Sequence, residues 1–138
     1  MRYMVLVKAN AQSEAGEMPS PEVLEEMGKF NEEMVKAGVM LAGEGLAASS
    51  QGARIRFDGS KRTVIDGPFT EAKELIAGFW IIQVQSKEEA IEWMKRSPFQ
   101  EGEIEIRRVF EPSDFGEGIA PETLEREQRL RSQIGSNA

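Results

Sequence analysis

The sequence predicts an α+β domain of the ferredoxin-like type, in which an antiparallel sheet carries its helices on one face. Two observations lead to this fold class. Runs of β-forming residues alternate with two amphipathic helical patterns along the first 110 residues. A hairpin pattern divides these elements into two βαβ-like halves, which is the arrangement of a ferredoxin-like sandwich.

The first half begins with a strand over residues 3–8, a short apolar run of β-forming residues. The polar stretch over residues 9–18 predicts a loop. Ser20 and Pro21 mark the start of a helix, as an N-cap followed by proline at the first helical position, and Gly38 ends it. Residues 39–46 predict the second strand. The helix has one predicted apolar face, formed by Val23, Leu24, Met27, Phe30, Met34 and Val35.

A hairpin is predicted next, because residues 54–57 and 62–65 are short alternating runs on either side of the turn sequence Asp58-Gly59-Ser60. Thr70 is expected to cap a single helical turn that reaches Leu75.

The second half repeats the pattern of the first. Residues 79–84 are strongly apolar and predict a buried strand. Ser86 and Glu89 form a capping-box sequence that opens the second helix, which ends before Pro98. Residues 103–110 alternate between polar and apolar and predict the last strand.

The chain is expected to hold one domain over residues 1–111 and a tail over residues 112–138. Its 138 residues fit a single domain, since domains commonly have ~100–200 residues. Within the tail, residues 121–134 predict a charged helix with a thin apolar stripe. We expect this helix to be an appendage of the domain.

Composition excludes several classes of function. The sequence has no cysteine and no histidine, which rules out disulfides, thiolate zinc sites, cysteine nucleophiles and triads with a histidine base. Without imidazole or thiolate ligands, a tight site for zinc, copper or haem is not expected. A carboxylate site for magnesium or calcium stays open, although the sequence has no EF-hand loop. We expect no metal and no cofactor. The formal net charge of -7 argues against nucleic acid and against an anionic membrane surface as partners. No run approaches the ~20 apolar residues of a membrane span, so we expect a cytoplasmic protein.

One segment carries a family resemblance. Residues 66–74 read DGPFTEAKE, and the stretches Gly78-Phe79-Trp80 and Ala90-Ile91-Glu92-Trp93 follow it. Together with the start MRYMVLVK and the strand 103–107, they resemble the DGPF branch of the YCII-related family over residues 1–110. The resemblance implies a ferredoxin-like fold of the dimeric α/β-barrel type, with a pocket between sheet and helices. The family is largely without assigned function, and the His-Asp pair proposed as catalytic in some relatives has no counterpart here.

Two carboxylates are candidates for a catalytic base. Asp66 ends a predicted strand beside the Gly67-Pro68 turn, where it could act as a general base or bind a cationic group. The alternative is a structural role, in which Asp66 binds backbone donors of the turn. Glu44 is a second, weaker candidate, because it would lie near Asp66 if their strands were adjacent.

Four further side chains are candidates for ligand binding. Phe69, Phe79 and Trp80 could form the wall of an apolar cavity, although aromatic residues in a strand more often belong to the core. Phe79 and Trp80 are neighbours in a strand and must face opposite sides of the sheet. Arg107 on the last strand is a candidate anion ligand.

The sequence supports three hypotheses of function, in this order. The first is a small-molecule-binding or accessory domain with a pocket near the DGPF motif. The second is a cofactor-independent isomerase or lyase with Asp66 or Glu44 as its base. The third is a regulatory protein-interaction module that uses the tail. A homodimer is expected in each case, because helices on one face of the sheet leave the other face without a cover.

Overall fold

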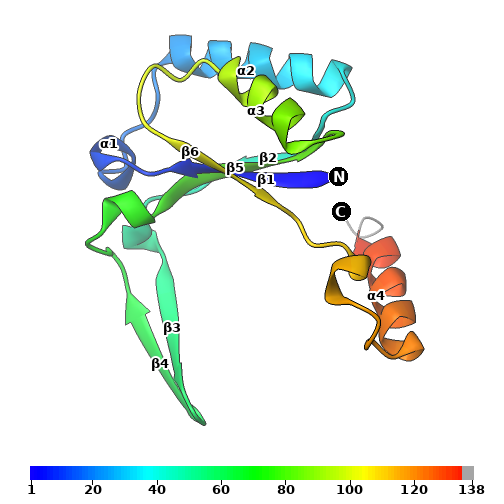
Figure 1. The fold of residues 1–138 in the computed structure, drawn as a ribbon. Coiled ribbons are helices and arrows are strands. Elements are labelled where there is room, and N and C mark those ends of the chain that lie inside the picture. Colours follow the sequence, from blue (N-terminus) through cyan, green and yellow to red (C-terminus); the bar gives the residue numbers. More distant parts are fainter. Residues whose placement is uncertain (135–138) are drawn as a thin grey trace.

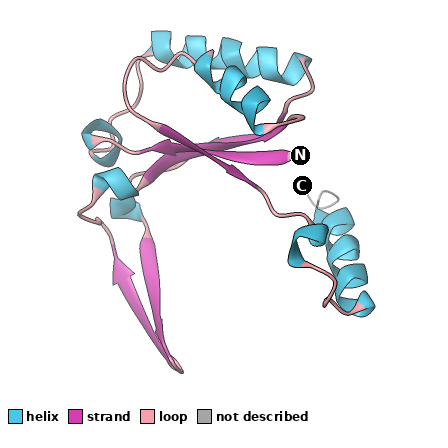
Figure 2. Ribbon diagram, in the orientation of Figure 1, coloured by secondary structure: helices cyan, strands magenta, loops and turns pink. Residues whose placement is uncertain are grey.

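The computed structural model describes residues 1–134, which form an α+β fold with two antiparallel sheets (Figures 1 and 2). The strands in this described part of the chain are β1 (Arg2–Lys8), β2 (Met40–Gly45), β3 (Ala53–Asp58), β4 (Lys61–Asp66), β5 (Ile76–Gln83) and β6 (Ile104–Arg108). The α-helices are α1 (Ala11–Glu14), α2 (Pro21–Lys36), α3 (Lys87–Lys95) and α4 (Pro121–Ile134). Single 3-10 turns are η1 (Ser49–Gln51), η2 (Ala72–Glu74) and η3 (Pro112–Phe115).

The main sheet has the strand order β2-β5-β1-β6, and every neighbouring pair is antiparallel. Two split βαβ units, β1-α2-β2 and β5-α3-β6, produce this order, which is compatible with a ferredoxin-like sandwich. The helices α2 and α3 lie together on one side of the sheet (Figure 1). The predicted fold class is thus confirmed at the level of an antiparallel α+β fold with its two main helices on one face.

The hydrophobic core lies between this sheet and the two helices. Strand alternation turns Tyr3, Val5, Trp80 and Ile82 toward the helices, where all four are buried. The two helices contribute the buried side chains of Phe30, Met34, Ala90 and Met94.

The apolar stripe of α2 is narrower than its sequence predicts. Phe30 and Met34 are buried and Met27 is partly buried against the core, but Val23, Leu24 and Val35 are 50%, 53% and 60% exposed. The two buried residues are four positions apart, so they lie on one line along the helix. Leu24 and Val35 lie off that line, whereas Val23 lies on it but in the first turn of the helix. All three are largely left in solvent.

The ends of the helices follow the predicted capping, with two differences. Ser20 accepts a hydrogen bond from Val23 N at 3.2 Å, and Ser86 accepts one from Glu89 N at 3.1 Å. The carboxylate of Glu89, however, accepts from Gln85 N at 2.8 Å, one residue before the position that a capping box predicts. The expected single helical turn is η2, which Thr70 does not cap.

The predicted loop over residues 9–18 contains the short helix α1, and this expectation was wrong. Asn10 and Ser13 form a reciprocal capping box, in which Ser13 N donates to Asn10 Oδ1 at 2.8 Å and Asn10 N donates to Ser13 Oγ at 2.9 Å. These bonds satisfy backbone donors that would otherwise be free at the start of the helix. None of the four helical residues is buried, so local hydrogen bonds rather than packing hold this helix.

The hairpin β3–β4 forms a sheet of its own and extends away from the main sheet (Figure 1). Ile55 pairs directly with Val64, and these two side chains are 57% and 65% exposed. A two-stranded hairpin alone is at best marginally stable in water. The hairpin and α4 both extend from the sheet on the side opposite α2 and α3 (Figure 1).

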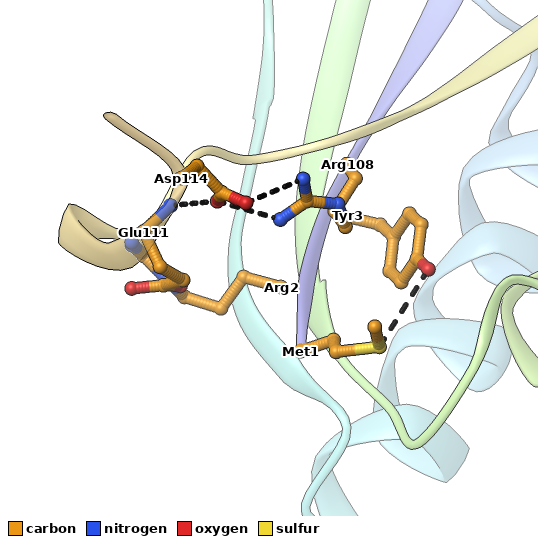
Figure 3. A network of polar contacts seen from close by, with 6 residues as sticks. All are labelled: Met1, Arg2, Tyr3, Arg108, Glu111 and Asp114. Carbon is orange, nitrogen blue, oxygen red and sulfur yellow. Dashed lines mark hydrogen bonds and ion pairs between the residues drawn. The ribbon is translucent and has the colours of Figure 1, made fainter. Parts of the chain in front are cut away.

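A polar network ties the segment before α4 to the main sheet (Figure 3). The guanidinium of Arg108 on β6 donates to both carboxylate oxygens of Asp114, at 2.7 and 2.8 Å, and Glu111 N donates to the same carboxylate at 2.6 Å. Arg2 Nε donates to Glu111 at 3.0 Å. The contacts of its carboxylate lower the pKa of Asp114 to about 2. The hydrogen bonds from Arg108 make the largest contribution to this shift, and the hydrogen bond from the Glu111 amide makes the next largest.

No helix in residues 1–134 combines the length and the apolar character that crossing a membrane requires.

Candidate functional site

Two cavities lie between the main sheet and its helices. The larger has a volume of about 570 Å³ and lies beside α3, β6 and the loop that joins them. The smaller has a volume of about 280 Å³ and lies between α2 and the strands β2 and β5. The two have four lining residues in common, which are Val7, Pro19, Ala77 and Phe99. The cavities are therefore neighbouring parts of one hollow region, with apolar walls at the point where they meet.

Trp80 forms part of the wall of the smaller cavity. Its side chain is 5% exposed, and its ring lies edge-on to Phe30 and to Phe99, with ring centroids 5.8 and 6.1 Å apart. Its indole Nε1 donates to Asn31 Oδ1 on α2 at 2.9 Å. Edge-on aromatic contacts and a satisfied indole donor are typical of a fixed side chain. The structure thus gives Trp80 one defined position in the cavity wall.

Gly43 on β2 makes room for the indole. The strand pairing places Gly43 opposite Trp80. A Cβ atom at Gly43 would lie 2.7 Å from Trp80 Cδ1 and 2.6 Å from Met40 Cε. The irregular pairing between Met40 and Ala42 lies next to this position. Gly43 is therefore the position at which β2 lies unusually close to a large side chain.

Phe79 and Glu44 contribute to the cavity differently from Trp80. They pair with each other across β5 and β2, one position along from the Trp80–Gly43 pair. Alternation therefore places their side chains on the opposite face of the sheet. Phe79 is half-buried there, and Glu44 is exposed. Both residues line the smaller cavity, and we attribute this to their backbone atoms.

Asp66 and Phe69 of the DGPF segment border neither cavity. Asp66 is the last residue of β4, where it pairs with Ala53 in the hairpin sheet, and it is exposed. Within the described chain its carboxylate forms no hydrogen bond or ion pair. Glu44 belongs to the main sheet, so the two candidate bases are on strands of different sheets.

The DGPF segment is held by a hydrogen-bonded cluster around Ser49. Phe69 N donates to Ser49 Oγ at 3.0 Å, and Ser49 N donates to Glu14 Oε2 at 2.9 Å. The hydroxyl of Ser49 donates to the other oxygen of Glu14. These two bonds, the hydroxyl first, lower the pKa of Glu14 from its ordinary value. The cluster connects α1, η1 and the DGPF segment.

Gly67 fits against η1 because it has no side chain. Its amide donates to Gly52 O at 3.0 Å, and a Cβ atom at this position would lie 1.7 Å from the Ser49 carbonyl oxygen. Phe69 is covered by the Arg54 guanidinium, which lies 3.8 Å from the ring centroid. Gly67 and Phe69 of the motif thus have a structural role, because their contacts attach the base of the hairpin to η1.

Arg107 lies on β6, where it pairs with Met4 of β1. It is exposed and donates to Glu105 Oε2 at 3.1 Å, and this contact contributes to a lowered pKa of Glu105. Arg107 lines neither cavity. In residues 1–134, no group of three or more carboxylates is arranged to hold a metal ion.

Asn31 is a cavity residue that the sequence did not reveal. It occupies the middle of α2, lines the smaller cavity and binds Trp80, 49 positions along the chain. A polar residue in a helix usually faces solvent, and no local pattern distinguishes Asn31 from its neighbours Glu32 and Glu33.

Comparison with known proteins gives two findings. The family model of the YCII-related domain matches residues 1–113. The chain is also 29% identical, over 73 residues, to an uncharacterized protein of Rhizobium meliloti (strain 1021). That match covers 53% of this chain and 59% of the relative, so the chain spans about three-fifths of the length of this curated relative.

Proposed function

The chain belongs to the YCII-related family, and from this premise we propose that it is a homodimeric small-molecule-binding protein whose ligand occupies the hollow region beside Trp80. One observation carries this proposal, which is the pair of neighbouring apolar cavities between the sheet and its helices. Small-molecule sites are typically concave, mostly apolar and ≈ 300–1,000 Å³ in volume. The larger cavity lies in that range, and the smaller is close to it.

The proposed pocket has Trp80 in its wall, with Phe79 contributing backbone. The DGPF segment supports the pocket indirectly, because it fixes η1 and α1, and Asn10 and Ser13 at the start of α1 line the larger cavity. We assign the chain to the DGPF branch of its family on the motif Asp66-Gly67-Pro68-Phe69.

The proposed dimer is supported by the face of the sheet that α2 and α3 leave open. Alternation turns Met4, Leu6, Phe79 and Ile81 toward that face, where Met4 pairs with Ile81 and Leu6 with Phe79. Because α2 and α3 both lie on the other side of the sheet (Figure 1), neither main helix covers these four apolar side chains. A second copy that packs its own sheet on this face would bury them and would give the dimeric α/β-barrel arrangement.

We favour the binding role over the alternative of an isomerase or lyase. That alternative needs a carboxylate base that burial has adapted to proton transfer, whereas Asp66 and Glu44 are both exposed. The interaction-module alternative depends on the tail, where α4 has no buried residue.

Native mass spectrometry of the freshly purified protein tests the proposal in one spectrum. We expect a dimer, with additional mass on a fraction of the molecules that corresponds to a retained ligand. Identification of that mass would define the ligand class. A monomer at micromolar concentration would contradict the dimer. A wild-type protein to which no small apolar compound binds, as judged by the indole N–H signal of Trp80 in NMR spectra, would contradict the pocket.

A further inference from the structure

The hydrogen bond between Trp80 and Asn31 determines which way the Asn31 amide group faces. An indole N–H can only donate, so Asn31 must turn its carbonyl oxygen toward Trp80 Nε1, at 2.9 Å. The NH2 group of the same amide then points away from the indole. Within residues 1–134, no hydrogen bond uses its two N–H donors. Asn31 therefore has a fixed orientation and an unused pair of donors.

These donors belong to a residue that borders an apolar cavity. Asn31 lines the smaller cavity together with apolar side chains, which are Val7, Pro19, Met27, Trp80 and Phe99. The other polar lining residue is Glu44. Because side chains alternate along a strand, the Glu44 side chain lies on the far face of the sheet. A polar group at an apolar wall is the usual means by which such a site orients its ligand.

The lining of the smaller cavity includes no lysine or arginine. In the larger cavity, Lys8 and Lys95 form ion pairs with Glu105 and Glu92, at 3.2 and 3.3 Å. A ligand carboxylate would therefore meet no free cation at Asn31, and the net charge of the chain is -7. An uncharged oxygen acceptor fits this environment better than an anion does.

We propose that Asn31 is a specificity-determining residue and that the ligand is a flat, mostly apolar molecule with an uncharged carbonyl group. The carbonyl oxygen accepts a hydrogen bond from the Asn31 NH2 group, and the apolar part lies along Trp80 and Phe99. This inference rests on the proposed function, since it names the ligand class of the same cavity.

Two probe compounds of nearly equal shape test the inference, acetophenone and α-methylstyrene, which differ by a C=O group in place of C=CH2. Binding to the full-length protein is followed by NMR, with the two tryptophan indole signals as reporters. Trp80 is expected to shift, and Trp93 on α3 serves as an internal reference. The compounds differ in hydrophobicity, so the quantity compared between protein variants is the ratio of their affinities.

The decisive variant is Asn31→Asp. An aspartate keeps an acceptor for the Trp80 indole and nearly the same volume, but it has no N–H donor. We expect the affinity ratio of acetophenone to α-methylstyrene to fall by about threefold to tenfold, which is the typical net effect of one hydrogen bond. Independently of any variant, the Asn31 side-chain NH2 signals of the wild type should shift with acetophenone and not with α-methylstyrene.

The outcomes separate the two proposals. An unchanged affinity ratio in a folded Asn31→Asp variant would overturn the role of Asn31 and leave the pocket in place. If that variant does not fold, the wild-type NH2 signals decide, and an equal response to both compounds overturns the inference. Failure of both compounds to shift Trp80 in the wild type would overturn the pocket and this inference with it.

Discussion

Gly43 and Trp80 face each other across β2 and β5 at a distance that leaves no space for a Cβ atom on the glycine. The indole lies against the bare backbone of β2, and its N–H reaches Asn31 on α2. The position of Trp80 therefore depends on the absence of a side chain at Gly43 on β2 and on the hydrogen-bond acceptor of Asn31 on α2. Both conditions concern the wall of the smaller cavity, where we place the ligand.

Replacing Gly43 with alanine should destabilise the fold and displace the indole. The new methyl group would lie 2.6 Å from Met40 Cε and 2.7 Å from Trp80 Cδ1, so these side chains must move. Overpacking of this kind typically costs ~1–3 kcal/mol. Urea unfolding followed by tryptophan fluorescence measures the loss of unfolding free energy.

Gly45→Ala is the matched control for this substitution. It makes the same change two residues further along β2, where a Cβ atom would meet nothing within 4 Å. We expect its unfolding free energy to stay close to that of the wild type. Equal effects of the two substitutions would show that the contact with Trp80 is not what requires glycine at position 43.

Replacing Gly67 with alanine should release the DGPF segment from η1. The methyl group would lie 1.7 Å from the Ser49 carbonyl oxygen, a backbone atom that cannot move without the turn. We expect a loss of unfolding free energy at the upper end of the ~0.5–3 kcal/mol range of single substitutions. The amide of Phe69, which donates to Ser49 Oγ, should also exchange its hydrogen faster.

Gly52→Ala tests whether any side chain added to this turn has the same effect. A Cβ atom at Gly52 would lie 3.5 Å from the same carbonyl oxygen, which is an ordinary contact. Hydrogen exchange at Phe69 should then remain slow. Slow exchange in Gly67→Ala as well would mean that the segment is not held through Ser49.

Local patterns predicted the main elements of the fold because each has a short-range cause. The N-cap at Ser20, the four-residue spacing of Phe30 and Met34, and the alternation of Phe79 and Trp80 are all visible in a few neighbouring residues. The short helix α1 was missed, because its capping box has Ser13 in place of the usual glutamate or glutamine and no buried residue marks it.

The site was less predictable because its contacts join distant parts of the chain. Trp80 was named as a candidate for ligand binding, which stays a prediction, and the structure places it at the smaller cavity. Its partner Asn31 is 49 positions away, and nothing in the helix pattern around Asn31 indicates that bond. Ser49 binds Glu14 across 35 positions in the same way. Such pairs depend on how the helices and strands pack against one another, and this packing cannot be predicted from residue spacing alone.

Replacing Phe79 with glutamate should dissociate the proposed dimer. Phe79 pairs with Leu6 in the middle of the open sheet face, so the substitution would place a charge at the centre of the interface. Burial of an unpaired charge costs several kcal/mol, and the dissociation constant should rise by roughly a hundredfold or more. Sedimentation velocity at micromolar concentration distinguishes the two states.

Val35→Glu is the control for this experiment. Val35 is 60% exposed on α2, on the other side of the sheet, and the substitution makes the same kind of apolar-to-acidic change. We expect this variant to remain a dimer. A Phe79→Glu protein that sediments as a dimer would place the interface elsewhere on the molecule.

Acid should weaken the attachment of the C-terminal segment through Asp114. Hydrogen bonds from Arg108 and from the Glu111 amide lower the pKa of Asp114 from 3.8 to about 2, so the unfolded chain binds this proton at a higher pH than the folded chain does. The stabilisation from ionised Asp114 is thus present above pH 3.8 and is lost as the pH falls toward 2. A titration of the Asp114 carboxyl carbon by NMR should have its midpoint near 2. In the Arg108→Gln variant this midpoint should move up toward 3.8, because the main cause of the lowered pKa is removed. A midpoint near 3.8 in the wild type would show that the Arg108–Asp114 pair does not form in solution.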